Sequence, residues 1–499
     1  MIINSILIKI NKMKTIKIIY FLFLILYIKA EGEINIDIST TSEGEDFEVK
    51  ENVITLNGEK TYILTGTSTD KSIVISSSCS LTLNGLSLSE EGGLTPIVIN
   101  ENCKVSLILS GESNLQDSSQ NTRDGVIYLN TGAELTITGS GSLNIIPNKY
   151  MAINGTVSTF LTMESGNIQI TSSSSVVGGI YLRKGITING GTFSYNVGSG
   201  IHHAIDTEGS ITITKGNFNI ISGNGKGLQA ENNLFIGEEG NSDSDLTIII
   251  KTSDEGIEAK GIEIYSGTII IEAGGDGINA ANDDVCNEQR CSGNCKCYIK
   301  FAGGNININS DEDGIDSNGD ITITGGVIVV LGASNGDDQP IDQDGLLTIS
   351  GATVLAAGTS SMGGVEATTS QVAAIYTEKV SEGSILTIFD NNEQIIMTKT
   401  TPKDVEYLYF TYPGSSFTMK LNGNQIETSD PSTIQQNGPN NPGNDPNVPS
   451  NGPNNPGNGP FNSNDPNNLE TQNNKTEAEN ISQFIKLQIT LILLKLLLL

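Results

Sequence analysis

The acidic residues of this chain gather in four short segments instead of being spread evenly. The segments are DEGIE (254–258), GGDGINAANDD (274–284), DEDGID (311–316) and DDQPIDQD (337–344). Each contains an isoleucine that follows Gly or Pro, and polar residues form two columns around it. The column two residues before the isoleucine contains Glu255, Asp276, Asp313 and Gln339, and the column one residue after it contains Glu258, Asn279, Asp316 and Asp342. Upstream, these columns continue as His203 and Lys226, and as Asp206 and Gln229.

Carboxylates stacked in neighbouring strands repel one another unless a cation lies between them. Ca²⁺ takes about six to eight oxygen ligands with loose geometry, and Gly-rich corners add backbone carbonyl oxygens. We therefore predict a calcium-binding face with Ca²⁺ as the cofactor. The predicted ligands are Glu255, Glu258, Asp276, Asn279, Asp283, Asp284, Asp311, Asp313, Asp316, Asp337, Asp338 and Asp342. The alternative is that these are solvated turn residues, because Asp and Gly are common in turns.

The elements that must position these columns are short strands in an internal repeat. The apolar residues of the recurring G-I-x phrase, which we term the anchors, are Val126, Ile153, Ile180, Ile205, Leu228, Ile257, Ile278, Ile315 and Ile341. Their separations are 27, 27, 25, 23, 29, 21, 37 and 26 residues, and the value of 37 becomes 21 without the 16-residue Cys-rich stretch 281–296. Each repeat holds three short stretches of alternating apolar residues, separated by Gly-rich corners such as GGT (190–192).

This pattern predicts an all-β protein built as a right-handed parallel β-helix, with three short strands and about 21–29 residues per coil. A calcium β-roll repeats every nine residues or so and a propeller blade needs about 40, so both are excluded. We predict irregular coils of the same helix over 31–120 and the regular helix with its acidic face over 121–372. Residues 373–432 predict a small antiparallel β cap over the open end.

Composition and both chain ends indicate an extracellular protein. The 499 residues include 57 Asp+Glu and 27 Lys+Arg, and the net charge of −30 argues against binding to nucleic acid. Residues 1–30 predict a signal peptide, and 433–475 predict an Asn/Pro/Gly-rich stalk. Residues 476–499 predict a hydrophobic anchor signal, exchanged for a glycolipid near Asn473 or Asn474 or retained as a tail anchor. We expect a secreted protein at a cell surface that touches the membrane only through this anchor.

The six cysteines favour disulfides in a secreted chain. Cys79 and Cys103 are 24 residues apart, about one coil, and equivalent positions in neighbouring coils are close enough to bond. The remaining four have the spacing C-x4-C-x3-C-x-C, which lacks the C-x2-C pairs of zinc sites, so we predict two disulfides and leave their pairing open. These four are Cys286, Cys291, Cys295 and Cys297. Glycosylation is predicted at Asn154 and Asn474.

The segments GGDGINA, DEDGIDSNGDITITGG and DEGIEAKGIEIYSGTIII resemble a bacterial family of secreted carbohydrate-binding β-helix proteins found in clostridia. That family is similar to pectate lyases and carries calcium between its coils. The resemblance covers roughly residues 120–425, and it implies calcium-assisted binding of polysaccharides, especially uronate polymers. Ca²⁺ that bridges carboxylates would reconcile an acidic protein with an acidic ligand. The chain departs from the family in its stalk, its Cys-rich insertion and its N-terminal coils, and it has no Trp to stack on sugars.

Two other functions fit the same residues. A calcium-dependent polysaccharide lyase would use the cation to acidify the proton beside a carboxylate, with Lys226, Lys260 or Arg183 as the base. The GHG and RIK phrases of β-helix polygalacturonases are absent from the sequence. A structural surface adhesin is the third possibility. Its Thr-bearing strands, such as TIT (322–324), predict irregular Thr rows, which argue against an ice-binding plane.

Overall fold

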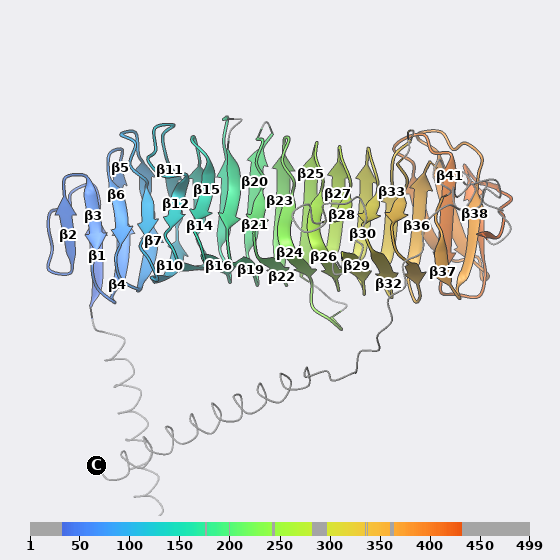
Figure 1. Cartoon of the computed structure of the whole chain (residues 1–499), viewed down its shortest axis with the longest axis horizontal. Coiled ribbons are helices and arrows are strands. Elements are labelled where there is room, and N and C mark those ends of the chain that lie inside the picture. The colour runs from blue at the N-terminus through green and yellow to red at the C-terminus, as the bar shows by residue number, and fades with distance from the viewer. Residues whose placement is uncertain are drawn as a thin grey trace, which may run out of the picture. The chain divides into compact units, whose positions relative to one another are not determined.

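The computed structural model describes residues 32–431 except 175–176, 199, 242–244, 282–296, 335, 337 and 360–363. The chain divides into two units, residues 1–438 and 439–499, and all described residues belong to the first. This unit is an all-β solenoid of about twelve turns, which confirms the predicted fold class (Figure 1). In the described ranges, no helix has the length and apolarity needed to cross a membrane.

The strands of successive coils stack into three parallel rows. In chain order within a coil, we call these the anchor row, which contains the anchor residues, the middle row and the third row. The anchor row contains β3 (Val53–Leu56), β6 (Ser72–Ile75), β9 (Ile97–Ile99), β12 (Gly125–Leu129), β15 (Met151–Gly155), β18 (Gly178–Leu182), β21 (Ile205–Thr207), β28 (Ile278–Ala280), β31 (Ile315–Ser317) and β34 (Ile341–Gln343). The middle row contains β1 (Glu33–Asp37), β4 (Thr61–Thr65), β7 (Cys79–Asn84), β10 (Lys104–Ser110), β13 (Glu134–Gly139), β16 (Phe160–Met163), β19 (Gly185–Ile188), β22 (Ser210–Ile213), β29 (Tyr298–Phe301), β32 (Asp320–Ile323), β35 (Leu347–Ile349) and β37 (Ala367–Thr369). Two long strands, β24 (Leu228–Ile236) and β26 (Ile257–Ile264), pass through both of these rows.

The third row forms a separate sheet along the solenoid. It contains β5 (Thr67–Ser68), β8 (Ser87–Ser89), β11 (Glu112–Gln116), β14 (Ser142–Ile146), β17 (Asn167–Thr171), β20 (Thr192–Val197), β23 (Gly216–Ser222), β25 (Leu246–Thr252), β27 (Thr268–Ala273), β30 (Asn305–Ser310), β33 (Val327–Leu331) and β36 (Thr353–Gly358). At the N-terminal end, β2 (Phe47–Lys50) pairs with β3 in an antiparallel hairpin.

The anchor residues pair directly from coil to coil, as the repeat predicts, with one correction. Ile153 pairs with Ile180 and with Ile127, so the anchor of that coil is Ile127 and not Val126. Val126 and Ile127 are both buried, so the alternation of apolar residues does not distinguish them. The predicted irregular coils follow the same ladder through Ile73 and Ile97, at separations of 24 and 30 residues, calculated as 97 − 73 and 127 − 97.

The core consists of ladders of apolar side chains that point into the solenoid from all three rows. In the third row, Tyr195 pairs with Ile220, which pairs with Ile250, and all three are fully buried. Burial raises the pKa of the Tyr195 hydroxyl above its ordinary value. Tyr195 therefore belongs to the core. Because inward and outward residues alternate, each row also presents regular outward columns at a strand spacing of about 4.8 Å.

The threonines of the middle row are more regular than the sequence suggests. Thr136, Thr162, Thr187 and Thr212 occupy the same outward position in four consecutive coils, so the expectation of irregular rows is wrong there. Phe235 follows in the next coil and ends the series. The corners between strands differ in length from coil to coil, so a comparison of sequence positions alone does not reveal that these threonines are aligned.

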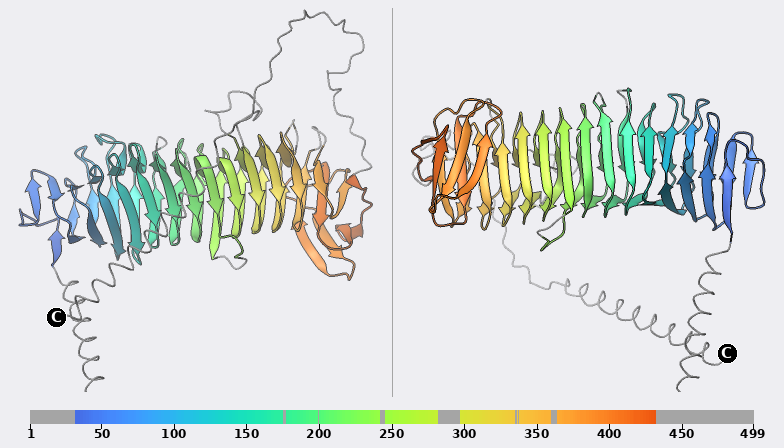
Figure 2. Two further views of the ribbon diagram at one scale, coloured as in Figure 1. Left: turned by 60° about the horizontal axis from the view of Figure 1, so that its bottom comes forward. Right: turned by 180° about the vertical axis from the view of Figure 1, so that it is seen from behind.

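The C-terminal strands form an antiparallel cap with two parts (Figure 2). Strands β41 (Tyr407–Tyr412) and β38 (Val372–Tyr376) extend the third row beyond β36 in antiparallel pairing. A separate sheet contains β40 (Ile395–Thr400), β39 (Ile385–Asp390), β42 (Phe417–Leu421) and β43 (Asn424–Gln425). Its Ile388 and Met419 pack on the outward side chains Val329 and Leu355 of the third row. The cap therefore covers both the last strand edge of this row and the outer face of its final coils.

The structure does not contain the predicted disulfide between Cys79 and Cys103, because both thiols are free. The residue opposite Cys79 in the next coil is Val105, so this coil is 26 residues long. Cys103 lies two positions before Val105 and is therefore not opposite Cys79. Cys286, Cys291 and Cys295 lie outside the described residues, and Cys297 is buried. Asn154 is 8% exposed and its Nδ2 donates to the carbonyl of Asp124 at 2.7 Å, so glycosylation there stays a prediction. Asn474 lies outside the described residues.

Candidate functional site

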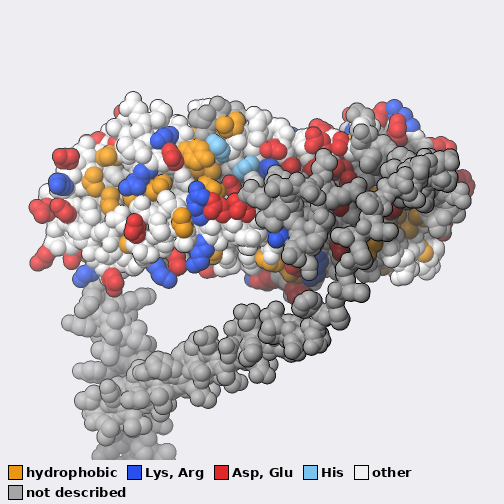
Figure 3. Space-filling view, viewed as in Figure 1, with side chains coloured by type: hydrophobic (Ala, Val, Ile, Leu, Met, Phe, Trp, Pro, Cys, Tyr) orange, Lys and Arg blue, Asp and Glu red, His pale blue; other side chains and the backbone are white. Residues whose placement is uncertain are grey.

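Both predicted columns lie on the outer surface of the anchor row. Strand register places six side chains at equivalent positions in consecutive coils: Asp206, Gln229, Glu258, Asn279, Asp316 and Asp342. Backbone hydrogen bonds from one coil to the next align the second column, which contains His203, Lys226, Glu255, Asp276, Asp313 and Gln339. On this side of the molecule, acidic side chains gather next to the histidines and basic side chains (Figure 3).

Hydrogen bonds to the backbone hold the second column in place. The Asp313 amide donates to Oδ1 of Asp276 at 2.9 Å, and the Gln339 amide donates to Oδ1 of Asp313 at 2.6 Å. Each carboxylate therefore accepts an N–H from the next coil, which fixes its position along the solenoid. The two residues cannot move apart without breaking the ladder that stacks the coils.

Three carboxylates from the last two coils of the columns come together. One oxygen each of Asp313, Asp316 and Asp342 lies within 4.8 Å of the others, and all three side chains are half-buried. Among the described residues, this is the group whose acidic side chains are arranged to share a metal ion. Oxygen ligands at such spacing suit a hard divalent cation.

The titration behaviour of these groups reflects their burial and their mutual repulsion. Burial, with the charges of Asp313 and Glu255, raises the pKa of Asp276 to about 8. Burial raises the pKa of Asp316 to about 7, helped by Asp276 and Asp342, and raises the pKa of Asp313 to about 7 although it accepts the Gln339 amide. The protein alone therefore does not stabilise the fully ionised cluster at neutral pH, and a bound cation would.

Amide oxygens in the same columns also lack partners. Asn279 donates through Nδ2 to Oε1 of Glu255 at 3.3 Å, and Gln339 donates through Nε2 to Oδ1 of Asp342 at 2.9 Å. Their oxygens, with Oε1 of Gln229, are buried without a hydrogen-bond partner in the described part of the chain. Buried acceptor atoms normally have a hydrogen-bond partner, so these unpartnered oxygens are suited to coordinating a cation. The donor set therefore fits Ca²⁺.

Of the three bases considered for a lyase, Lys226 lies within the columns. Its ammonium forms ion pairs with Glu255, at 3.1 Å, and with Glu258, and its side chain is 17% exposed. Its backbone amide donates to Nδ1 of His203 at 2.9 Å, and burial, with the Lys226 charge, lowers the pKa of His203 to about 4. Lys260 lies on β26 and forms no ion pair with a described residue. Lys226 therefore neutralises the first coils of the acidic columns.

The N-terminal part of the same face is aromatic and basic. Tyr128 and Tyr181 occupy the column of Asp206 and Asp316, with Asn154 between them. Arg123 lies over the Tyr128 ring and Arg183 over the Tyr181 ring, each at 5.1 Å from the ring centroid. Arg183 also forms an ion pair with Glu208. Sequence reasoning missed Tyr128. It places the anchor of this coil at Val126, so the column position one residue after the anchor is assigned to Ile127 and not to Tyr128.

The other predicted ligands are spread more widely. Asp311 is 79% exposed and lies 3.7 Å from Nζ of Lys403, outside the carboxylate cluster. Asp338 lies close enough to Glu312 to raise the pKa of that group, although burial is the larger cause. Asp283, Asp284 and Asp337 lie outside the described residues. The structure thus brings together the column residues and leaves Asp311 apart.

Comparison with known proteins identifies one family. The model of carbohydrate-binding domain-containing proteins matches residues 50–243 and 242–385. A solved structure of a polysaccharide lyase-like protein from C. thermocellum, a gadolinium derivative, is 18% identical, covering 64% of this chain and 96% of that one with a TM-score of 0.31. No curated protein matches the sequence significantly.

Proposed function

Since this chain belongs to the family of carbohydrate-binding domain-containing proteins, we propose that it binds an acidic, uronate-type polysaccharide with the help of Ca²⁺ held on the anchor row. The observation that carries the proposal is the group of Asp313, Asp316 and Asp342, whose carboxylate oxygens converge within 4.8 Å. Three like charges at this distance call for a cation, and the buried amide oxygens beside them offer further ligands.

The residues that would hold the ion are Asp313, Asp316 and Asp342, with Asp276 and Asn279 in the adjoining coil. When bound, Ca²⁺ supplies positive charge and open coordination positions for the carboxylates of a polymer. The protein residues fix the site along the solenoid, where the positive charge of the ion would offset part of the repulsion that a −30 chain exerts on a polyanion.

The aromatic and basic end of the face would contact further sugar units of the same polymer. Tyr181 is three coils from Glu258 in one continuous column, and each coil adds about 4.8 Å. Arg183 and Arg123 supply positive charge for uronate carboxylates, and tyrosine rings can stack on sugar rings. The column therefore favours a polymer that runs along the solenoid axis.

Binding without cleavage is the form of the proposal that the geometry favours. A lyase needs an unprotonated base next to the acidified proton, and Lys226 is the base candidate within the columns. Its side-chain nitrogen is already engaged in ion pairs with Glu255 and Glu258 and is not directed at a substrate. The predicted signal peptide and anchor signal would place this binding activity outside the cell, at its surface.

The test is retention of the full-length protein on immobilised polygalacturonate, with calcium and with chelator. We expect retention in calcium, release by EDTA, and loss of retention in Asp316→Asn. The matched control is Asp311→Asn, which removes a carboxylate from the same segment but outside the cluster, and it should bind like the wild type. Unsaturated products released from the polymer would instead support the lyase. Absence of retention on any polysaccharide would favour the adhesin.

A further inference from the structure

The outer face of the third row carries almost no charge over five coils, from β11 to β23. These strands have fifteen outward positions, twelve of which hold an amide or hydroxyl side chain and two an isoleucine. The one charged residue is Glu112, at the edge. The central column of this neutral face is Asn114, Asn144, Gln169, Ser194 and Asn219.

Solubility alone does not explain this composition. The chain has 57 acidic residues, and soluble surfaces are normally covered by charged side chains. Where the cap covers the third row, the equivalent outward positions hold apolar residues. Val329 and Leu355, in later coils, are buried against the cap. The neutral face is exposed, and it carries groups that both donate and accept hydrogen bonds.

Many of these groups are free to bind a ligand. At the N-terminal edge, Asn144 donates to Oδ1 of Asn114 at 2.9 Å and to Oε1 of Glu112 at 3.2 Å. These bonds resemble an amide ladder, in which each side-chain amide bonds to its equivalent in the next coil. The ladder does not continue. The side chains of Gln169, Ser194 and Asn219 have no hydrogen-bond partner among the described residues, and Gln169 and Asn219 are exposed. If the polar side chains served only to stabilise the stack of coils, we would expect them to hydrogen-bond to one another in these coils too.

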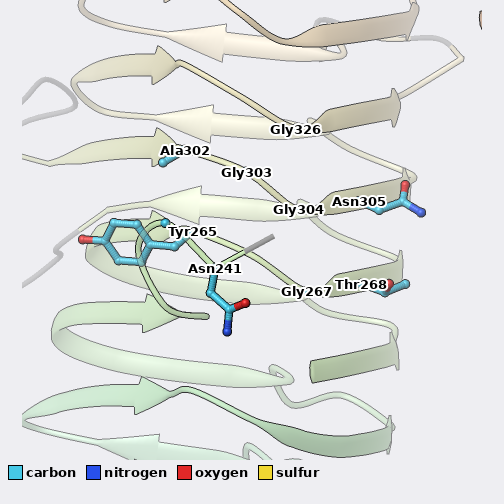
Figure 4. A pocket seen from close by; sticks show the side chains of 10 residues that line it. Asn241, Tyr265, Gly267, Thr268, Ala302, Gly303, Gly304, Asn305 and Gly326 are labelled. Atoms are coloured by element: carbon cyan, nitrogen blue, oxygen red, sulfur yellow. The ribbon is translucent and has the colours of Figure 1, made fainter. Parts of the chain in front are cut away.

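The neutral face leads into a cleft at the next corner of the solenoid. Its edge column continues from Asn217 through Thr247 and Thr268 to Asn305. Thr268 and Asn305 border a cleft of about 560 Å³. Figure 4 shows glycine turns between these two residues and Tyr265 on the opposite side. Glycines that carry no side chain let a ligand approach the backbone closely.

Tyr265 is held in a fixed position in this cleft. Its hydroxyl donates to Oε2 of Glu263 at 2.7 Å, and Nζ of Lys300 lies over its ring at 5.2 Å from the centroid. An aromatic ring fixed beside amide and hydroxyl groups is the combination that recognises a sugar, with stacking on the ring and hydrogen bonds to the hydroxyls.

We propose that the neutral face and the Tyr265 cleft form a second carbohydrate-binding surface, which takes a neutral polysaccharide and needs no calcium. Uncharged donors and acceptors at a spacing of about 4.8 Å match a polymer that carries hydroxyl groups but no carboxylates. The family match supports the assignment, because its first segment, 50–243, contains all five strands and none of the converging carboxylates. This surface is separate from the anchor row, so the proposal does not depend on the calcium site.

The test is depletion of the full-length protein from solution by microcrystalline cellulose and by insoluble chitin, in EDTA. We expect binding to at least one of these polymers. The triple variant Gln169→Ala, Ser194→Ala, Asn219→Ala should bind about 10- to 100-fold more weakly, which corresponds to the loss of about three hydrogen bonds. Tyr265→Ala should weaken binding as well.

The matched control is Thr162→Ala, Thr187→Ala, Thr212→Ala, which removes three outward hydroxyls from the middle row of the same coils and should bind like the wild type. Equal thermal unfolding of both triple variants would show that the fold is kept. The proposal is overturned if neither polymer retains the wild type in EDTA, or if the face variant binds as well as the control. Asp316→Asn should keep this binding, which separates a failure here from a failure of the calcium-dependent function.

Discussion

The carboxylate cluster makes a prediction about stability and pH that can be worked out from the structure. Asp316 has a folded pKa of about 7 against an ordinary value of 3.8, because it is buried and faces Asp276 and Asp342. In the folded chain it keeps its proton to higher pH than in the unfolded chain. Without calcium, the resulting stability is fully present below about pH 4 and is lost as the pH rises through about 7.

The size of the effect follows from the shift. About three pKa units at about 1.4 kcal/mol each correspond to about 4 kcal/mol. Asp276 and Asp313 titrate together with Asp316, so one shift, and not the sum of three, sets the scale. For a solenoid of about 400 residues, 1 kcal/mol changes the melting temperature by about 1 °C. About a third of this loss has already occurred at pH 5, so we expect the calcium-free protein to melt about 3 °C lower at pH 8 than at pH 5.

The substitution Asp316→Asn should change the stability in opposite directions with and without calcium. In EDTA at pH 8 it removes a buried charge, so the variant should melt up to about 4 °C higher than the wild type. In calcium it lacks a ligand, so the metal should stabilise it less than the wild type. Differential scanning calorimetry at pH 5 and pH 8 measures both effects, with Asp311→Asn as the control. A calcium-free wild type that melts at the same temperature at both pH values would refute the reasoning.

Three further predictions test the other parts of the structure. Ile220→Ala should cost about 2–5 kcal/mol of unfolding free energy in chemical denaturation, because Ile220 is fully buried in the third-row ladder, whereas Ile221→Ala, on the outward side, should cost far less. Tyr181→Ala should weaken calcium-dependent binding to polygalacturonate about fivefold or more in a retention assay and leave calcium-induced stabilisation unchanged, since Tyr181 lies outside the carboxylate cluster. Cys79 should react slowly with iodoacetamide at pH 8 in the folded protein and rapidly after unfolding, because burial raises the pKa of its thiol to about 11.

Periodicity predicts this fold well because a solenoid repeats one physical requirement in every coil. A strand must place apolar residues inward at alternate positions, and the next coil must match them. This is why both acidic columns, from His203 to Gln339 and from Asp206 to Asp342, are found from the sequence. The antiparallel strands β39 to β43 also fall within the range 373–432, where the sequence predicts an antiparallel cap.

The errors arise where consecutive buried residues or uneven corners hide the register. Val126 and Ile127 are both buried, so the sequence does not show which one is the anchor. Cys79 and Cys103 are separated by 24 residues, but the local coil adds 26, so their side chains are not opposite each other. The neutral face escapes notice for another reason. Asn and Ser at outward positions look like ordinary polar strand residues until the register aligns them in one column.

The solenoid explains why one chain can carry two surfaces of opposite chemistry. Inward residues of all rows are constrained by the core, but the outward side chains of one row can vary independently of those of another row, because the rows face different sides of the solenoid. On the anchor row, backbone hydrogen bonds keep Asp276 and Asp313 in consecutive coils, so a bound cation, and not movement, would relieve their repulsion. On the third row, the same stacking keeps Gln169, Ser194 and Asn219 in line without charge. In our two proposals, rigid stacking therefore produces cation affinity in one row and recognition of neutral sugars in another.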